Sequence, residues 1–162
     1  MLLGTHAGLP LILLAWRRVR AGTVGKDLIP TRYLIVTAIV GALPDLLNPH
    51  ISLESRLSSW SHGLPFFALF TALLYLGMIP KRSPITWRWA TFWSFAYGAH
   101  LFCDAISGGI AWKYPFGNEV WGDQWIPPGI LWFASDFFFL IGNYILLRIV
   151  PMIQSNVRSA PR

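Results

Sequence analysis

Cysteine is almost absent from this chain, which carries Cys103 as its single thiol in 162 residues. One cysteine excludes an internal disulfide and a zinc site made of several thiolates, and it leaves the redox compartment open. Charged residues are also scarce, at 12% of the chain, against about 25% in an average soluble domain. No repeat or low-complexity tract is visible. A metal site in this chain must therefore use His, carboxylate or water ligands.

Hydrophobic residues take the place of the missing charge. They make up 54% of the chain, nine residues are Trp, and the mean hydropathy is +0.50. This composition is typical of a membrane protein. The length allows one compact bundle, so we predict a single domain over residues 1–150 and a short basic cytoplasmic tail over residues 151–162.

Several apolar stretches approach the length of a membrane-spanning helix, which needs roughly 20 mostly apolar residues and about 17 at the least. They predict an all-α, polytopic membrane bundle of about five transmembrane segments. The first two stretches are short, so we expect tilt, local thinning or incomplete spanning there. The five stretches are Leu2–Trp16, Tyr33–Leu47, Gly63–Ile79, Trp89–Ser107 and Gly129–Leu147.

The basic residues predict the orientation of the bundle. Positive charge follows the first apolar stretch instead of preceding it, which argues against a cleaved signal peptide and places the N-terminus outside. Nearly all Lys and Arg then fall on one side of an alternating bundle, and the positive-inside rule makes that side the cytoplasm. The net charge of +6 is explained in this way without a nucleic-acid partner. These residues are Arg17, Arg18, Arg20, Lys26, Arg32, Lys81, Arg82, Arg88, Arg148, Arg158 and Arg162.

The two predicted outer loops, about Asn48–His62 and Gly108–Pro128, keep Arg56 and Lys113 as their basic residues. They are rich in Trp, the residue expected where a membrane meets its headgroups. Glu119 and Asp123 are read as simple loop acids, and His50 as a loop residue.

Ionisable side chains from every apolar stretch fall at one predicted depth, near the outer face. An ionisable side chain in a spanning helix costs about 2.5–3.5 kcal/mol on insertion scales, and such groups usually face the bundle interior. No Lys or Arg lies within a predicted span, so a metal, the histidines or bound protons must compensate the carboxylates. The set comprises His6, Asp45, His62, His100, Asp104 and Asp136.

His100 and Asp104 carry the clearest local signal, because residues four apart on a helix share a face. Imidazole plus carboxylate suits zinc, and also manganese or iron. A lone membrane histidine is more often structural, which weakens the case for His6 on its own. Asp136 is read as a ligand, a base or a partner that holds a ligand imidazole. Cys103, on a neighbouring face of the same helix, reads as a small buried thiol.

The ordered set of polar motifs resembles the YdjM-like bacterial inner-membrane proteins, a family taken to be metal-dependent hydrolases. The resemblance spans about Thr5 to Phe139, and its ordered set is fairly specific although each piece alone is weak. Two departures are visible: the His-Arg-Gly that commonly precedes the family's Thr-His-Ser is missing before His62, and Asn48 stands where a second Asp is common. Arg56 would replace the substrate contacts of that missing Arg only if the loop before His62 had a different shape. The pieces are Thr5-His6, Gly41-Ala-Leu-Pro-Asp45, Ser61-His62-Gly63, His100-Leu-Phe-Cys-Asp104, and Gly109 with Tyr114-Pro-Phe116.

The order of ligands is also similar, more distantly, to zinc-dependent phospholipase C and P1-type nucleases. That analogy implies that Asp45, His62, His100 and Asp104 hold one metal, and that Asp104 bridges to a second ion also bound by His6. The remaining His and Glu ligands of those enzymes have no counterpart, so the analogy implies one or two ions and no third. The analogy ranks below the argument from depth.

These features predict hydrolysis by metal-activated water, with Asp45 or Asp136 as the catalytic base. The expected substrate is a membrane lipid or lipid-linked molecule with a phosphoester, or another ester, at the outer leaflet boundary. A metal-ion or proton transporter and a structural, metal-stabilised membrane protein are the alternatives. Substrate identity and oligomeric state do not follow from the residues.

Overall fold

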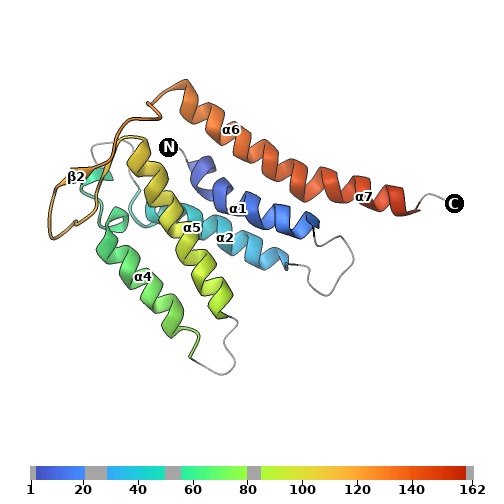
Figure 1. Ribbon diagram of the computed structural model, residues 1–162, viewed down its shortest axis with the longest axis horizontal. Coiled ribbons are helices and arrows are strands. Elements are labelled where there is room, and N and C mark those ends of the chain that lie inside the picture. The colour runs from blue at the N-terminus through green and yellow to red at the C-terminus, as the bar shows by residue number, and fades with distance from the viewer. Residues whose placement is uncertain (1–2, 21–28, 50–55, 80–84, 160–162) are drawn as a thin grey trace.

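The computed structural model describes residues 3–20, 29–49, 56–79 and 85–159. The fold is mostly helical (Figure 1), which confirms the all-α prediction. His50 and four of the basic residues used for the orientation, Lys26, Lys81, Arg82 and Arg162, lie outside the described residues. The elements are α1 (Leu3–Arg20), α2 (Thr31–Leu47), η1 (Trp60–His62), α4 (Leu64–Leu76), α5 (Trp87–Ile106), β1 (Ile110–Ala111), β2 (Val120–Trp121), α6 (Ile130–Tyr144), η2 (Ile145–Ile149) and α7 (Val150–Ser159).

The helices begin and end where the sequence supplies the usual signals. Pro65 lies in the first turn of α4, where its missing N–H costs no hydrogen bond. Arg17, Arg18 and Arg20 occupy the last turn of α1, where positive charge complements the helix dipole. Proline also occurs inside α2 at Pro44, and it removes a backbone donor from the turn that ends beside Asp45.

The helices pack around α5, which contacts α1, α2 and α4, while α6 lies along α1 (Figure 1). The core between α2 and α5 is built on Val40, Trp93, Ala96 and Tyr97. The polar groups of Trp93 and Tyr97 in this core are both hydrogen-bonded. The Trp93 indole N–H donates to the Thr37 hydroxyl at 3.1 Å, and the Tyr97 hydroxyl donates to the Ser61 carbonyl. The second of these bonds ties α5 to the segment that carries His62.

Gly41 sets the distance between α1 and α2. A Cβ at this position would clash with the His6 carbonyl oxygen and would lie 2.9 Å from Pro10 Cγ. Glycine therefore permits the close approach of the two helix backbones. This approach brings His6 of α1 against the α2–α5 pair.

The chain between α5 and α6 forms a small antiparallel hairpin, with Ile110 opposite Trp121 and Ala111 opposite Val120. Gly109 precedes it with φ +84°, a conformation that favours glycine. At the exposed end, Lys113 Nζ donates to Glu119 Oε2 at 2.7 Å. This hydrogen bond and the Lys113 charge lower the pKa of Glu119, in keeping with a simple loop acid.

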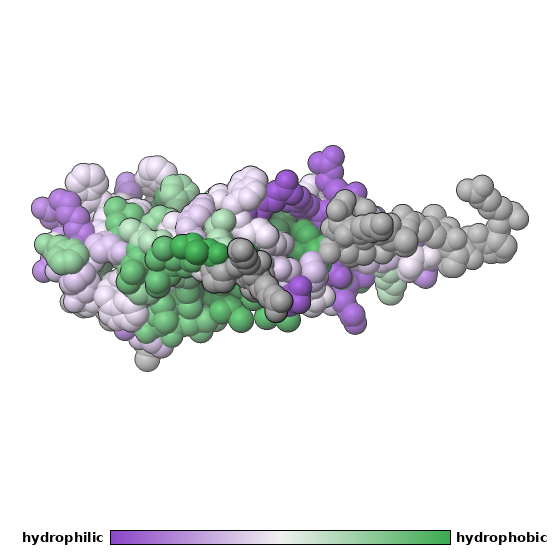
Figure 2. All heavy atoms as spheres, turned by 90° about the horizontal axis from the view of Figure 1, so that it is seen from below, coloured by the Kyte–Doolittle hydropathy of each residue, from purple (hydrophilic) through white to green (hydrophobic). Residues whose placement is uncertain are grey.

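Large apolar side chains cover the outside of α4 and α6. Among the described residues, α4 has no buried residue and α6 has Asn143 as its one buried residue. Phe133, Phe137 and Phe138 of α6 are each about two-thirds exposed. Figure 2 shows hydrophobic residues gathered across the middle of one face, with hydrophilic residues on either side along the long axis. Such a surface is unusual for a soluble monomer.

One helical stretch in the described part of the chain, the 27 residues Ile130–Asn156, is long and apolar enough to cross a membrane. It joins α6, η2 and α7 into one rod (Figure 1). The apolar helix α4 is shorter. The prediction of about five spans is therefore not confirmed by helix length and composition, and it stays a prediction.

Candidate metal centre

Four side chains that can ligate a metal converge at one end of the bundle. Asp45 comes from the last turns of α2, His62 from η1, and His100 and Asp104 from α5. One potential ligand atom from each lies within 4.8 Å of those of the other three. His62, His100 and Asp104 are buried, whereas the Asp45 side chain is 21% exposed. Asp45 therefore forms the accessible edge of the group.

The imidazole nitrogens and carboxylate oxygens approach one another closely. His62 Nε2 lies 3.2 Å from Asp45 Oδ1 and 3.3 Å from Asp104 Oδ2. His100 Nε2 lies 3.3 Å from the same Asp104 oxygen, as expected for an i, i+4 pair on one helix face. The two Nε2 atoms are 3.2 Å apart. Two nitrogens and two carboxylate oxygens around one point fit zinc, manganese or iron.

His100 is oriented by the backbone of α2. Its Nδ1 lies 2.8 Å from the Gly41 carbonyl oxygen. Because a carbonyl can only accept, Nδ1 carries the proton of this bond. In the neutral imidazole this leaves the lone pair on Nε2, directed at Asp45 and Asp104. The Gly41 carbonyl thus holds the His100 ring in the Nδ1-protonated tautomer, in which Nε2 is able to ligate a metal.

A network of small polar residues orients His62. Its Nδ1 lies 2.8 Å from Ser59 Oγ, which in turn accepts from Asn48 Nδ2 at 2.9 Å. Ser61 Oγ donates to the Pro44 carbonyl at 2.7 Å and lies 2.9 Å from Ser59 Oγ. Asn48 therefore supports His62 through Ser59.

His6 lies beside the four-residue group. Its Nε2 is 3.3 Å from Asp104 Oδ1, and its ring stacks on that of His100 with the centroids 3.7 Å apart. Its side chain is buried. The structure thus brings His6 to Asp104, the carboxylate that the analogy with phospholipase C assigns as a bridge between two ions. His6 contacts Oδ1, whereas His62 and His100 contact Oδ2.

Arg56 is a residue of this site whose position the sequence did not predict. No Lys or Arg lies within a predicted span, yet the inference that a metal, the histidines or bound protons must compensate the carboxylates is wrong for Asp104, because Arg56 Nη1 donates to Asp104 Oδ1 at 2.7 Å. Arg56 lies outside every apolar stretch, yet its side chain is only 2% exposed. A count of charges within spans misses a side chain that enters from a neighbouring loop. The signal that marked it was its isolation as the basic residue of the first outer loop.

Comparison with known proteins identifies the family. The family model described as YdjM inner membrane protein matches residues 1–160. The chain belongs to this family. No curated protein and no solved structure matches it significantly. The distant likeness to zinc-dependent phospholipase C and P1-type nucleases therefore stays an analogy.

In this member of the YdjM family, Asp136 contacts the start of α1. Its carboxylate accepts hydrogen bonds from the Thr5 backbone N–H at 2.7 Å, the Thr5 hydroxyl at 2.6 Å and the Gly4 N–H at 3.0 Å. These are donors at the start of α1, which lack partners within the helix. The structure thus joins Asp136 to the N-terminus of α1 and does not bring it into the four-residue group. Its role as a base stays a prediction.

The remaining candidates lie outside the group. Cys103 is a free, buried thiol, as expected from its residue type. Asp123 is exposed, and its carboxylate accepts from the Gln124 N–H at 2.7 Å. Neither contributes to the four-residue group.

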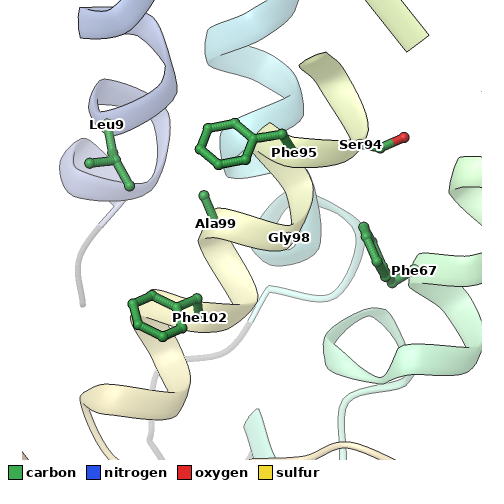
Figure 3. Close-up of a pocket in the computed structure, with 7 residues that line it drawn as sticks. All are labelled: Leu9, Phe67, Ser94, Phe95, Gly98, Ala99 and Phe102. Atoms are coloured by element: carbon green, nitrogen blue, oxygen red, sulfur yellow. The ribbon is translucent and has the colours of Figure 1, made fainter. Parts of the chain in front are cut away.

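An apolar groove of about 420 Å³ runs along α5 between α1 and α4 (Figure 3). On α5 it is lined by Ser94, Phe95, Gly98, Ala99 and Phe102. Phe95, the Gly98–Ala99 pair and Phe102 recur every three or four residues and so share one face. At about 100° per residue, His100 and Asp104 project from the other side of the helix. The groove is therefore separate from the candidate metal centre.

Proposed function

We propose that this protein is an integral membrane metal-dependent hydrolase that cleaves a phosphoester, or another ester, of a lipid or lipid-linked substrate. The observation that carries the proposal is the convergence of Asp45, His62, His100 and Asp104, with one ligand atom from each within 4.8 Å of the others. Zinc is the metal that this donor set suggests first, with manganese and iron also suited to it.

In this proposal the two histidines hold the metal and Asp45 takes part in the reaction. His62 and His100 are buried and fixed through their Nδ1 atoms, so they serve as rigid ligands. Asp45 is the partly exposed member, and we assign it the role of accepting a proton from the attacking water. A divalent ion held there would lower the pKa of a bound water towards about 7 and neutralise charge on the ester oxygen.

The position of the centre supports a membrane-boundary substrate. The centre lies at the hairpin end of the bundle (Figure 1). Trp121 and Trp125 in the same region are 65% and 72% exposed, as expected of Trp at a headgroup boundary. A lipid presents its ester or phosphoester bonds at this depth. A lipid substrate therefore reaches the centre without leaving the membrane surface.

The opposite end of the bundle supports the orientation. Arg17, Arg18 and Arg20 end α1, Arg32 lies in the first turn of α2, and Arg88 lies in the first turn of α5. All are at the helix ends remote from the centre. The positive-inside rule makes that end cytoplasmic, so we place the centre on the extracytoplasmic side of a multi-pass protein.

The core between the centre and the basic end of the bundle favours a hydrolase over a transporter. Val40, Trp93, Ala96 and Tyr97 fill the space between α2 and α5 on the cytoplasmic side of His100. A transport path needs ionisable or hydrated groups along the span, and this part of the described core is packed with apolar and aromatic side chains.

The test is the metal content of the detergent-purified protein by mass spectrometry, with wild type compared with His100→Ala and Asp104→Asn. We expect bound metal in the wild type and its loss in both variants. Hydrolysis of short-chain phosphodiester and ester lipids should fall more than about 100-fold in both, since outer partners of a ligand alone are worth about 10- to 100-fold. Asp123→Asn, an exposed carboxylate on the hairpin, is the matched control and should keep both properties.

A wild-type protein that stays empty after reconstitution with zinc, manganese and iron would overturn the proposal. Metal bound in the wild type without hydrolysis of any lipid ester, together with a sharp loss of thermal stability on chelation, would instead assign the centre a structural role.

A further inference from the structure

The Arg56 guanidinium is fixed against the candidate metal centre by three hydrogen bonds. Nη1 donates to Asp104 Oδ1 at 2.7 Å, and Nη2 donates to the Asp104 and Gly109 carbonyls at 3.4 and 3.1 Å. The side chain is 2% exposed. A buried guanidinium keeps its charge, so this position carries a permanent positive charge inside the protein.

Asp104 faces two different sets of partners. Its Oδ2 lies 3.3 Å from both His62 Nε2 and His100 Nε2, which is the side of the four-residue group. Its Oδ1 faces Arg56 and, at 3.3 Å, His6. A carboxylate that bridged two ions would offer one oxygen to each, and here Oδ1 is already bound to a cation.

We infer that the centre holds a single metal ion, and that Arg56 supplies the second positive charge that a two-metal hydrolase would take from its second ion. The inference rests on the proposed function. A second divalent ion at Asp104 Oδ1 would lie against the guanidinium, and like charges repel strongly where water is excluded. His6 Nε2 contacts the same carboxylate oxygen, and the His6 ring stacks on His100 as a packing partner.

The same arrangement indicates the substrate class. Arg56 has five N–H donors, of which three bond to described residues, and its buried Nε has no partner among them. Buried donors are rarely left unmatched. A guanidinium beside a metal ion is suited to bind a phosphoryl oxygen and to neutralise its charge. We therefore assign the centre an anionic phosphoester in preference to a neutral carboxylic ester.

Two measurements on the detergent-purified, metal-reconstituted protein test this. Mass spectrometry against protein concentration gives the number of ions per chain. Isothermal titration with inorganic phosphate gives the affinity of the loaded centre for a phosphoryl anion. The variants are Arg56→Met, which keeps an apolar stem without charge, and Arg56→Lys, which keeps the charge without the fork. Lys113→Met, on the exposed hairpin, removes the same charge away from the centre.

We expect one ion per wild-type chain. Phosphate affinity should fall about tenfold or more in Arg56→Met, less in Arg56→Lys, and not at all in Lys113→Met. Two ions per wild-type chain, or phosphate affinity unchanged in Arg56→Met and Arg56→Lys, would overturn the inference and leave the hydrolase proposal standing. No ion in the wild type would overturn the hydrolase proposal itself. If Arg56→Met does not fold, the wild-type stoichiometry and Arg56→Lys still decide.

Discussion

The buried Asp104 and the half-buried Asp136 show how two carboxylates of one chain take different tasks. Asp104 contacts His6, Arg56, His62 and His100 at 2.7–3.3 Å. Asp136 instead accepts from three donors at the start of α1. The first environment gathers groups that bind cations, whereas the second satisfies backbone and hydroxyl donors.

Asp136→Asn separates a structural role of this residue from a catalytic one. The amide keeps one acceptor oxygen, so we expect loss of at least one charge-assisted bond and about 1.5–3 kcal/mol of the free energy of unfolding. Thermal unfolding followed by circular dichroism measures the loss. Metal content should be unchanged. Full thermal stability combined with a large fall in hydrolysis would show that Asp136 acts as the base.

At the scale of the element, α2 is the helix that organises the centre. Its final turns provide the Asp45 carboxylate, the Gly41 carbonyl that orients His100 and the Pro44 carbonyl that receives Ser61. The same Gly41 permits contact with α1. A shift of α2 would therefore disturb both histidines and Asp45 together.

Gly41→Ala should cause such a shift. The added Cβ would clash with the His6 carbonyl and crowd Pro10, and overpacking of this kind costs about 1–3 kcal/mol. We expect a lower unfolding temperature and weaker metal binding, measured by thermal scans and metal titration. The matched control is Gly98→Ala in α5, where a Cβ would make an ordinary contact at 3.5 Å with Phe67. Equal behaviour of the two variants would contradict the prediction.

At the scale of the whole molecule, the protein has two chemically different ends. The centre and the Trp-rich hairpin lie at one end, and the basic helix ends lie at the other. Exposed apolar residues of α4 and α6 lie between them. This arrangement is the one expected if the proposed centre works at one membrane face.

Single cysteines in a Cys103→Ala background test that orientation. Trp125→Cys on the hairpin side and Arg88→Cys on the basic side both replace exposed residues. With a membrane-impermeant maleimide we expect Trp125→Cys to react in intact cells and Arg88→Cys to react only after permeabilisation. The opposite pattern would invert the proposed topology, and reaction of both in intact cells would contradict spanning.

The sequence predicted the helical class and most of the centre for a simple reason. Apolar periodicity and spacing fix how far along a helix each residue lies, and four-residue spacing fixes a shared face. His100 and Asp104 follow from that spacing. Asp45 and His62 follow from their position at the ends of neighbouring apolar stretches, and the structure places all four together.

Only the tertiary structure decided which neighbours each polar residue meets, because depth along a helix carries no information about which helices are adjacent. Asp136 has the expected depth, yet α6 packs along α1, so the carboxylate meets Gly4 and Thr5. Arg56 lies outside every apolar stretch, yet its loop places the guanidinium on Asp104. Residue types and spacing determined the four potential ligands, and helix packing determined their partners and the charge beside them.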